Sequence, residues 1–582
     1  MNPTAEQFLN RLRDHRERGG NSMGRLSAWV TKHTNLGGKK YSFKDHEFQE
    51  AIIDDTASAA VVVKPSQVGL SQATVHMVLG FLATNPNTTM LYGLQTLKFS
   101  QQFAKSRIDP VIRESPDIAE MMVPGNDSSL FKQFTNSSQL HVVGFSPGSS
   151  IISVPASGVI SDETDFSSAE AIATGESRLS HSPFVSSDGV RGFRRYFSTP
   201  TVSGYGVDAR FQSSDKKRRL VKCKSCSDWF WPSFFENVVV DTWDQPISEM
   251  TALEAQVLDD NGALKSARLI CPHCHNVVTQ QNLAAPHREW VAEHPEVTRM
   301  SGWHCSPFDL PTYHTPYTLF RKLIDTGDAH YHHFVNFALG LPFVSALNSV
   351  RDSAVAENTT VNPIMPARAY GEVSGCVAGI DIGKTSWITI GKVIDHQLHI
   401  VYVEQIKLRA EDGSDLESRV LELMRLYRVA IGFMDSYPYT DTLLRIISRY
   451  PALKGVDYSI REKALEMMVV REDIDTVKMN RTKVLNFLVK RINTGQIKFP
   501  KMPETAVVAS HLKAIRQVQQ TKESGEMVEV WVETGPDHYA HALAYCNMAA
   551  QSLMDSMTTG FAMAPTIKQA EVGSKYVPSK AA

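Results

Sequence analysis

The sequence predicts an α/β protein with two successive sheet domains. From about residue 41 to 215, short apolar runs alternate with helical segments, which is the βαβ rhythm of a parallel sheet. From residue 377 a second series begins with a three-strand meander and continues into a helix and another strand. Between the two series, two C-x-x-C pairs indicate a small metal-binding insertion.

The first series contains apolar runs of strand length separated by segments of helical length. We expect strands at Ala59–Val63, Thr89–Leu94, Leu140–Val143, Gly158–Ile160 and Arg195–Ser198, with helices at Gln72–Leu82 and Leu97–Ile112. Parallel strands joined by helices place their carboxyl ends at one edge of the sheet, where ligands bind in open α/β folds.

The segment after the first of these strands, Lys64–Ser71, resembles a phosphate-binding loop. The usual pattern, G-x-x-x-x-G-K-[ST], places a lysine directly before the serine or threonine. Here Gly69 and Ser71 occupy their expected places, but Leu70 replaces the lysine. Lys64 stands at the front of the loop, and its long stem could bring a point charge to the phosphates from the other side. The alternative is a polar strand-to-helix turn that binds nothing.

A second acidic segment supports the nucleotide interpretation. Asp162 and Glu163 follow the strand at Gly158–Ile160. Asp162 would hold Mg²⁺, which prefers hard oxygen ligands, and Glu163 would activate the attacking water. Together with Lys64 and Ser71, these residues predict an ATPase that uses ATP and Mg²⁺.

The paired cysteines predict a structural zinc site. Cys223, Cys226, Cys271 and Cys274 have the spacing of two knuckle turns that supply four thiolates. Four thiolates leave no open position for a substrate, so this Zn²⁺ would be structural. His273, His275 or Cys305 could replace a ligand, and four reduced thiols in a small core are the alternative.

Carboxylates at the ends of elements in the second series predict a nuclease. Asp381 ends an apolar strand, Asp435 ends the strand Val429–Asp435, and Asp537 lies at the start of a late helix. In an RNase H-like domain, the first strand, the fourth strand and a late helix bring such groups around two Mg²⁺ or Mn²⁺ ions. Two ions roughly 4 Å apart stabilise the attacking and leaving oxygens of a phosphodiester. His541 shares a helix face with Asp537, so the third ligand is open among Asp537, His541 and His538.

Charge and hydropathy restrict the remaining choices. The net charge is −2, so contacts to nucleic acid must come from local basic segments such as 216–219 and 477–483 rather than from a global field. No apolar run has the length of a membrane span, and the polar N-terminus lacks the apolar centre of a signal peptide. We therefore expect a cytoplasmic protein with no membrane contact.

In their order along the chain, these motifs resemble the large terminase subunit of tailed bacteriophages, in its lambda-like branch. The resemblance covers roughly residues 40–550 and includes Lys64–Ser71, Ser161–Asp165, Phe197–Thr201, the cysteine insertion, His333–Pro342 and the distal aspartates. It implies an ATPase motor that pumps double-stranded DNA into a procapsid, joined to a nuclease that cuts concatemeric DNA. It also implies a small terminase subunit and the portal protein as partners, a homo-oligomeric ring, and the host cell cytoplasm as location.

The resemblance also implies roles for single residues. Lys64, Gly69 and Ser71 would bind phosphate, Asp162 would hold magnesium, and Glu163 would activate water. Ser198 and Thr199 resemble the segment that couples hydrolysis to movement. Gln49 resembles an adenine-contacting glutamine. Arg178 would be an arginine finger acting on its own site or a neighbour's, with Arg194 and Arg195 as rivals. Many relatives carry a carboxylate where His541 stands.

The expected fold is therefore a P-loop ATPase domain with a parallel sheet and a zinc-binding insertion, followed by an RNase H-like α/β nuclease domain. The expected boundaries are an N-terminal helical segment at 1–40, the ATPase domain at 41–345 with its insertion at 216–282, a linker at 346–372, the nuclease domain at 373–550 and a flexible tail at 551–582. A cellular DNA-repair helicase-nuclease and a non-catalytic zinc-bearing scaffold are the alternatives, and Leu70 is the best support for the scaffold.

Overall fold

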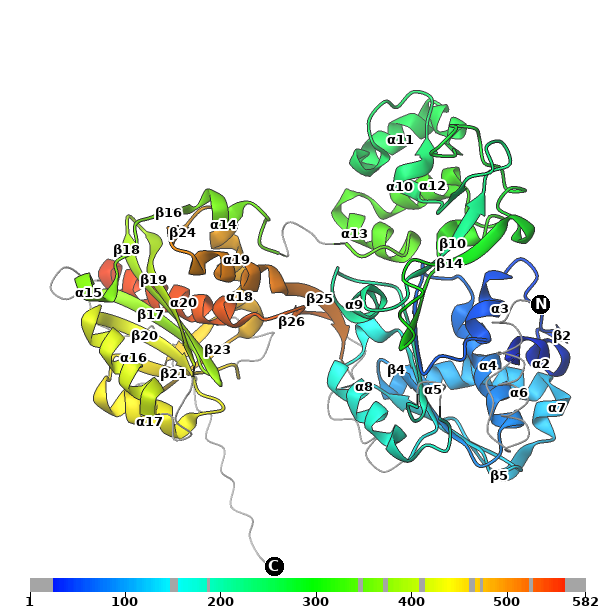
Figure 1. The fold of residues 1–582 in the computed structure, drawn as a ribbon, viewed down its shortest axis with the longest axis horizontal. Coiled ribbons are helices and arrows are strands. Elements are labelled where there is room, and N and C mark those ends of the chain that lie inside the picture. Colours follow the sequence, from blue (N-terminus) through cyan, green and yellow to red (C-terminus); the bar gives the residue numbers. More distant parts are fainter. Residues whose placement is uncertain are drawn as a thin grey trace, which may run out of the picture. The chain divides into compact units, whose positions relative to one another are not determined.

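The computed structural model describes residues 25–146, 155–185, 189–343, 349–369, 375–407, 414–459, 466–470, 475–522 and 527–559. The chain divides into two compact units. One comprises Met1–Val344 with Val518–Glu529, and the other comprises Ser345–Gln517 with Val530–Ala582. Each unit contains its own sheet with helices packed on it (Figure 1).

The first unit carries the nucleotide loop. Its strands are β1 Asn35–Leu36, β2 Lys39–Lys40, β3 Ala59–Val63, β4 Thr89–Leu94, β5 Met122–Ser128, β6 Phe131–Phe134, β7 Gln139–Gly144, β8 Gly158–Asp162, β9 Phe193–Ser198, β10 Lys217–Lys222, β11 Trp229–Phe230, β12 Val238–Val239, β13 Arg268–Leu269, β14 Arg288–Ala292 and β15 Met300–His304. Its helices are α2 Leu26–His33, α3 Phe48–Ile53, α4 Leu70–Thr84, α5 Leu97–Phe103, α6 Asp109–Glu114, α7 Pro116–Ala119, α8 Ala169–Glu176, α9 Gly206–Gln212, α10 Phe234–Asn237, α11 Ala252–Asp260, α12 Pro316–Thr326 and α13 Tyr331–His333.

The main sheet of this unit is mixed. Its order is β11-β10-β15-β3-β9-β8-β4-β7-β6-β5, with β14 beside β10. The strands from β15 to β7 run parallel to one another, as the sequence predicts. Antiparallel strands are added at both edges. All residues of β3 and β8 are buried, because helices cover both faces of this part of the sheet.

The helices of the first unit differ from the prediction at two places. Helix α4 begins at Leu70, two residues before the predicted start, because Leu70 is buried in the apolar core. The predicted helix at 97–112 is interrupted by a π-helical stretch, Ala104–Ile108. Pro110 follows this stretch in the first turn of α6, and a proline has no N–H for a regular helical hydrogen bond.

The described part of the N-terminal segment belongs to the core of the first unit. Leu26 and Val30 of α2 are buried in the same apolar cluster as α4. Residues 1–24 of the expected N-terminal helical segment lie outside the described residues.

The second unit contains the predicted meander and the late helix. Its strands are β16 Thr359–Val361, β17 Cys376–Asp381, β18 Thr385–Ile394, β19 Gln397–Lys407, β20 Val429–Asp435, β21 Leu453–Asp457, β22 Met468–Val470, β23 Thr476–Met479 and β24 Ile497–Pro500. Strands β25 Ile515–Thr521 and β26 Met527–Glu533 pair with each other, and each has residues in both units. The helices of the second unit are α14 Ala354–Glu357, α15 Pro366–Ala369, α16 Ser414–Leu426, α17 Thr440–Arg449, α18 Arg481–Asn493, α19 Glu504–Ala514 and α20 His538–Thr559.

The sheet of the second unit has the order β16-β24-β19-β18-β17-β20-β21-β23-β22. Strands β17, β18 and β19 pair antiparallel in sequence, which confirms the meander. Strand β20 then pairs parallel to β17. This pairing places the ends of β17 and β20, and therefore Asp381 and Asp435, beside each other.

Two predicted boundaries of the second unit are wrong. The segment expected to be a linker, 346–372, contains β16, which pairs with β24, and Val355, which is buried in the core. This strand is too short to show a period, and its partner is far away in sequence. The tail was expected from residue 551, but α20 continues to Thr559, and Leu553 packs against the core.

Gly379 determines how closely α20 approaches β17. A Cβ atom at Gly379 would lie 1.9 Å from the carbonyl oxygen of Ala542 and 2.3 Å from the backbone nitrogen of Cys546. Both contacts are with backbone, so a side chain here would push the helix off the strand. The glycine therefore allows the start of α20 to lie over the end of β17.

We expect Gly379→Ala to destabilise the second unit by about 1–3 kcal/mol, as overpacking does in other cores. Gly535→Ala is the matched control, because its Cβ would meet only the Ala514 side chain at 3.7 Å. Urea unfolding of the two variants measures the difference. Equal midpoints for Gly379→Ala and the wild type would contradict this account of the helix contact.

Candidate nucleotide and metal sites

The predicted phosphate-binding loop lies at the carboxyl end of β3, in the middle of the parallel strands. Gly69 is the N-cap of α4 and has φ 77°, a left-handed conformation that favours glycine. Leu70, at the position of the usual lysine, is 1% exposed and points into the apolar core. Leu70 therefore supplies no cation at the position of the usual lysine. Lys64 is the residue predicted to supply it instead.

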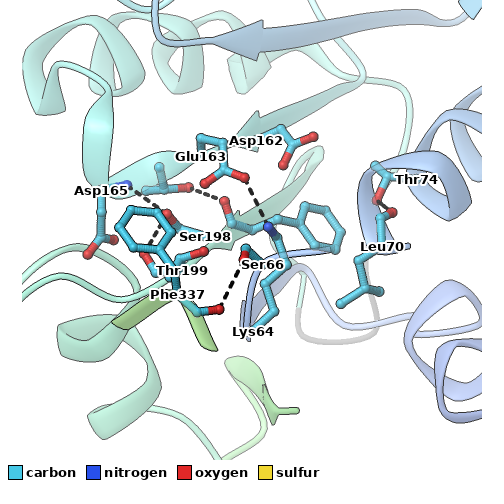
Figure 2. A network of polar contacts seen from close by, with 12 residues as sticks. Lys64, Ser66, Leu70, Thr74, Asp162, Glu163, Asp165, Ser198, Thr199 and Phe337 are labelled. Carbon is cyan, nitrogen blue, oxygen red and sulfur yellow. Dashed lines mark hydrogen bonds and ion pairs between the residues drawn. The ribbon is translucent and has the colours of Figure 1, made fainter. Parts of the chain in front are cut away.

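Lys64 is close to the catalytic acid that the sequence predicts. Its Nζ lies 3.0 Å from Oε1 of Glu163, although 99 residues separate them (Figure 2). The Lys64 side chain is 5% exposed. Burial opposes its charge, but the carboxylates of Glu163 and Asp162 outweigh this effect and raise the pKa of Lys64. The lysine is therefore a buried cation held at the phosphate loop.

Asp162 has the surroundings expected of a magnesium-holding carboxylate. Its Oδ2 accepts a hydrogen bond from the Tyr92 hydroxyl at 2.8 Å, whereas Oδ1 is buried with no hydrogen-bond partner among the described residues. Burial raises the pKa of Asp162, and Lys64 partly offsets this. The Ser71 hydroxyl also lowers the pKa of this carboxyl, so it lies nearby. An orphaned carboxylate oxygen near a hydroxyl fits the oxygen ligands of Mg²⁺.

Glu163 has an unusual backbone conformation. Its φ is 59°, in the left-handed region, where a residue with a Cβ is strained. The conformation turns the chain sharply after β8 and directs the Glu163 side chain toward Lys64. Such strain is common at functional sites, where the surrounding structure holds it.

The predicted coupling residues lie between the two halves of this site. Strand β9, which ends at Ser198, runs between β3 and β8. The Ser198 carbonyl accepts from the Lys64 N–H at 3.1 Å, and its hydroxyl accepts from the Asp165 N–H at 3.3 Å. Thr199 follows and is 1% exposed, and its carbonyl accepts from the Ser198 hydroxyl.

Asp165 is a functional candidate that the sequence analysis did not single out. Its carboxylate accepts hydrogen bonds from the N–H and hydroxyl of Thr201 at 2.8 and 2.9 Å, and from the Val207 N–H at 2.7 Å. Burial raises the pKa of Asp165 to about 7 despite these donors. The acidic residue two positions after Glu163 was the available signal.

Gln49 is hydrogen-bonded to the phosphate-binding loop. Its side-chain amide donates to the Val68 carbonyl at 2.8 Å, and the residue is 1% exposed. Because the side-chain amide of Gln49 is bonded to the loop, this hydrogen bond would have to break before the amide could contact adenine.

Arg178 does not lie at the nucleotide site of its own chain. Its carbonyl accepts from the Ala156 N–H, at the start of β8, six residues before Asp162. At the rise of a β-strand this is about 20 Å from the carboxyl end. Arg195 is 1% exposed and donates to the carbonyls of Asp55 and Ala57, and Arg194 lies 3.9 Å from Glu176. A finger acting on the same chain's site is therefore excluded for Arg178 and Arg195.

The four predicted zinc ligands converge. Their sulfur atoms all lie within 4.8 Å of one another, and no other such group occurs among the residues that the structure describes. The Cys223–Cys274 and Cys226–Cys271 sulfur distances are both 3.7 Å. A tetrahedron with Zn–S bonds of about 2.3 Å has edges of about 3.8 Å. The four thiols therefore fit a tetrahedral zinc ion.

Both cysteine pairs form the same turn. The N–H of Ser227 donates to the Cys223 carbonyl, and the N–H of His275 donates to the Cys271 carbonyl. Ser227 and His275 both have positive φ, 67° and 56°. The N–H of Asn276 lowers the pKa of the Cys274 thiol, whereas burial raises the pKa of the Cys271 thiol. His273, His275 and Cys305 are not members of the group, and Cys305 lies in the core at the end of β15.

We expect purified protein to contain about one zinc ion per chain, and Cys271→Ser to lose it, because three thiolates cannot complete the closed site. Cys376→Ser is the control, since Cys376 is buried in the other unit. Metal analysis by mass spectrometry measures both. Full zinc content in Cys271→Ser would contradict the assignment.

The second unit brings together the first two predicted nuclease carboxylates. Asp381 and Asp435 end the neighbouring parallel strands β17 and β20. Burial and the charge of Asp381 raise the pKa of Asp435 to about 6. Two carboxylates that disfavour each other's charge are a suitable pair of ligands for a divalent cation.

The residues expected to supply the third ligand lie at the start of α20. Among the described residues, the three aspartates do not form a compact group of the kind that the four cysteines form. Asp537 lies one residue before the helix, and its Oδ2 is 3.2 Å from Nε2 of His541. Burial opposes the charge of Asp537, but His541 outweighs it and lowers the pKa. His538 contacts Asp381 instead, with Nδ1 2.9 Å from Oδ2. Each histidine is therefore paired with one of the carboxylates, and Asp537 stays the predicted third ligand.

Two further residues surround His541. The Tyr458 hydroxyl is 3.3 Å from Nδ1 of His541, and Arg481 donates to the Trp531 carbonyl while one guanidinium nitrogen lies 3.5 Å from Nε2 of His541. Arg481 belongs to the basic segment 477–483, which provided the sequence signal for it. Tyr458 had no signal, because only the fold brings it to this place.

The other basic segment, Lys216–Arg219, is not an open cationic surface. Lys217 pairs with Asp215 and lies over the Trp303 ring, and Arg218 is 3.6 Å from Glu293. Arg219 is 5% exposed. Lys217, Arg218 and Arg219 form the first half of strand β10, and their charges are used within the fold, so the segment is a poor candidate for gripping DNA.

Comparisons with known proteins agree with the nucleotide site. Residues 44–290 match the family model of the ATPase domain of the phage terminase large subunit gpA. No curated protein matches the chain. Among the described residues, no helix has the length and apolar character needed to cross a membrane.

Solved structures similar to the chain include phage terminases. The bacteriophage HK97 large terminase is 9% identical with a TM-score of 0.48, covering 90% of this chain and 98% of that one. The large terminase of the thermophilic bacteriophage D6E, in complex with ATP-gamma-S, is 10% identical with a TM-score of 0.28, covering 86% and 96%. The large terminase nuclease of thermophilic phage G20c with bound magnesium is 17% identical with a TM-score of 0.25, covering 36% and 98%. All three TM-scores lie below 0.5.

Proposed function

We propose that this protein is a viral DNA-packaging motor, the large subunit of a phage terminase, with an ATPase in its first unit and a metal-dependent endonuclease in its second. The observation that carries the proposal is the Lys64–Glu163 contact within the segment that matches the terminase ATPase model. A cation from the front of the loop replaces the usual lysine, and it lies beside the acid that would activate water.

The ATPase step follows from the arrangement of these groups. The loop amides and Lys64 would bind the phosphates of ATP, with Ser71 and Asp162 holding Mg²⁺, which would neutralise charge on the phosphates. Phosphate oxygens would compete with Glu163 for Lys64. The released Glu163 would then accept a proton from the water that attacks the terminal phosphate.

The nuclease step rests on Asp381, Asp435 and Asp537. These carboxylates would hold two Mg²⁺ or Mn²⁺ ions, which supply the nucleophile and stabilise the leaving oxygen. Double-stranded DNA would be gripped mainly through its phosphates, because a packaging motor must move any sequence. A ring of subunits on the portal, contact with a small terminase subunit, work in the host cytoplasm and membership of the lambda-like branch complete the proposal.

We expect Glu163→Gln to retain nucleotide binding but to lower ATP hydrolysis by roughly 10²–10⁴-fold, because the amide cannot accept a proton. Glu170→Gln, on the exposed first turn of α8, is the matched control and should hydrolyse ATP like the wild type. Steady-state phosphate release measures hydrolysis, and fluorescent nucleotide titration measures binding. Hydrolysis by Glu163→Gln at the wild-type rate would assign the general base elsewhere.

We expect the wild type to linearise or degrade supercoiled plasmid with Mn²⁺ and Asp381→Ala to lose this activity, because it lacks a ligand of both ions. Asp441→Ala, exposed at the start of α17, should cleave normally. Gel analysis of the plasmid measures cleavage.

If neither protein cleaves, Mn²⁺ titration by calorimetry decides the assignment. Mn²⁺ binding that Asp381→Ala loses would support a nuclease that is silent outside the packaging complex. An absence of Mn²⁺ binding in the wild type would contradict the nuclease assignment.

A further inference from the structure

Residues Asn336–Gly340, here named the strap, lie against the phosphate loop. The Ser66 N–H and hydroxyl both donate to the Phe337 carbonyl, at 2.8 and 3.0 Å (Figure 2). Gly340 has φ 69°, and a Cβ atom there would lie 2.7 Å from the backbone nitrogen of Pro65. The strap backbone therefore contacts the loop directly, and a shift of the loop must move it.

The strap also holds the segment that follows β9. The side-chain amide of Asn336 donates to the carbonyls of Thr201 and Leu341, both at 2.8 Å, and Asn336 is 6% exposed. On its other side, Thr201 donates its N–H and hydroxyl to Asp165. Thr201 is thus fixed between Asp165, two residues after Glu163, and the strap.

A third contact connects the strap with the turn that carries Glu163. The Phe337 ring lies over the Phe166 ring, with centroids 6.0 Å apart and planes at 21°. The strap therefore touches all three parts of the candidate ATPase site: the loop, the acidic turn and the segment after β9.

The strap and the two residues before it also contribute side chains to the apolar core of the insertion. Phe334, Val335 and Leu339 are buried in the apolar cluster that also contains Cys223 and Cys271 of the insertion. The Phe334 ring packs edge-to-face on Phe234 of α10, with centroids 5.6 Å apart. Packed cores transmit displacements because they tolerate few voids. Residues 334–340 therefore contact the phosphate-binding loop and also pack in the core of the insertion.

We propose that Asn336 is a positioning residue that couples the nucleotide site to the zinc-binding insertion. The inference rests on the proposed ATPase function. When phosphates draw Lys64 away from Glu163, the loop and the acidic turn shift, the strap follows through Ser66 and Thr201, and the insertion moves with the strap. Asn336 itself touches no nucleotide. It keeps Thr201 and the strap moving as one body.

The test uses Asn336→Asp in the full-length protein. The carboxylate has nearly the same shape, but it cannot donate to either carbonyl. We expect the dissociation constant for ATP to stay within about threefold of wild type, while kcat falls by roughly tenfold, the size of a typical coupling between sites. In the wild type we expect a nucleotide-dependent change in hydrogen exchange over residues 234–258, and we expect Asn336→Asp to lose it.

Asn85→Asp is the matched control. Asn85 is 2% exposed and donates to the Phe81 carbonyl at 2.9 Å, at the far end of α4 from the loop. It should leave kcat and the exchange response unchanged. Equal losses in Asn85→Asp and Asn336→Asp would overturn the inference, as would wild-type kcat and exchange response in Asn336→Asp.

The wild type alone also tests the inference if Asn336→Asp does not fold. ATP hydrolysis without any nucleotide-dependent change in exchange over residues 234–258 would overturn the coupling and leave the ATPase proposal intact. A wild type that neither binds nor hydrolyses ATP would overturn the proposed function, and the coupling with it.

Discussion

The buried charge of Lys64 is the interaction on which the nucleotide site depends. A lysine in an apolar interior keeps its charge only beside an anion, because the cost of desolvation is otherwise too large. In this structure Glu163 supplies that anion, 3.0 Å away. The same requirement makes the pair responsive to phosphate, since a stronger and more highly charged anion can replace the carboxylate. An ion pair that is stable yet exchangeable suits a site that alternates between two states.

The sheet makes this interaction geometrically available. Lys64 and Glu163 lie just beyond the ends of β3 and β8, and β9 holds these strands at a fixed distance with Ser198 at its end. The second unit uses the same device. Parallel pairing of β17 and β20 places Asp381 beside Asp435, and the glycine at 379 lets α20 approach so that His538 reaches Asp381. In both units, charged residues meet at the ends of parallel strands.

The sequence predicted what depends on local pattern. The strands β3, β4 and β20 match their apolar runs in every residue, and the cysteine pairs converge as their spacing indicates. Lys64 could be identified because the loop lacked a cation and a lysine stood at its front. The own-site option for Arg178 fails because the chain after Glu163 returns to the opposite end of the sheet, which no local pattern reveals. Action on a neighbour's site stays a prediction. Asp165, Asn336 and Tyr458 were missed for a similar reason, since their partners are distant in sequence or are backbone atoms.

In the proposed ATPase, Lys64 binds the terminal phosphates of ATP in place of the lysine missing at position 70. A crystal or cryo-electron microscopy structure with ADP, aluminium fluoride and Mg²⁺ tests it most directly. We expect Nζ of Lys64 to lie within hydrogen-bond distance of a phosphate oxygen of ADP or a fluorine atom of the aluminium fluoride, and Glu163 to have turned to the attacking water. A nucleotide bound with Lys64 still paired to Glu163, and with another cation on its phosphates, would contradict the account.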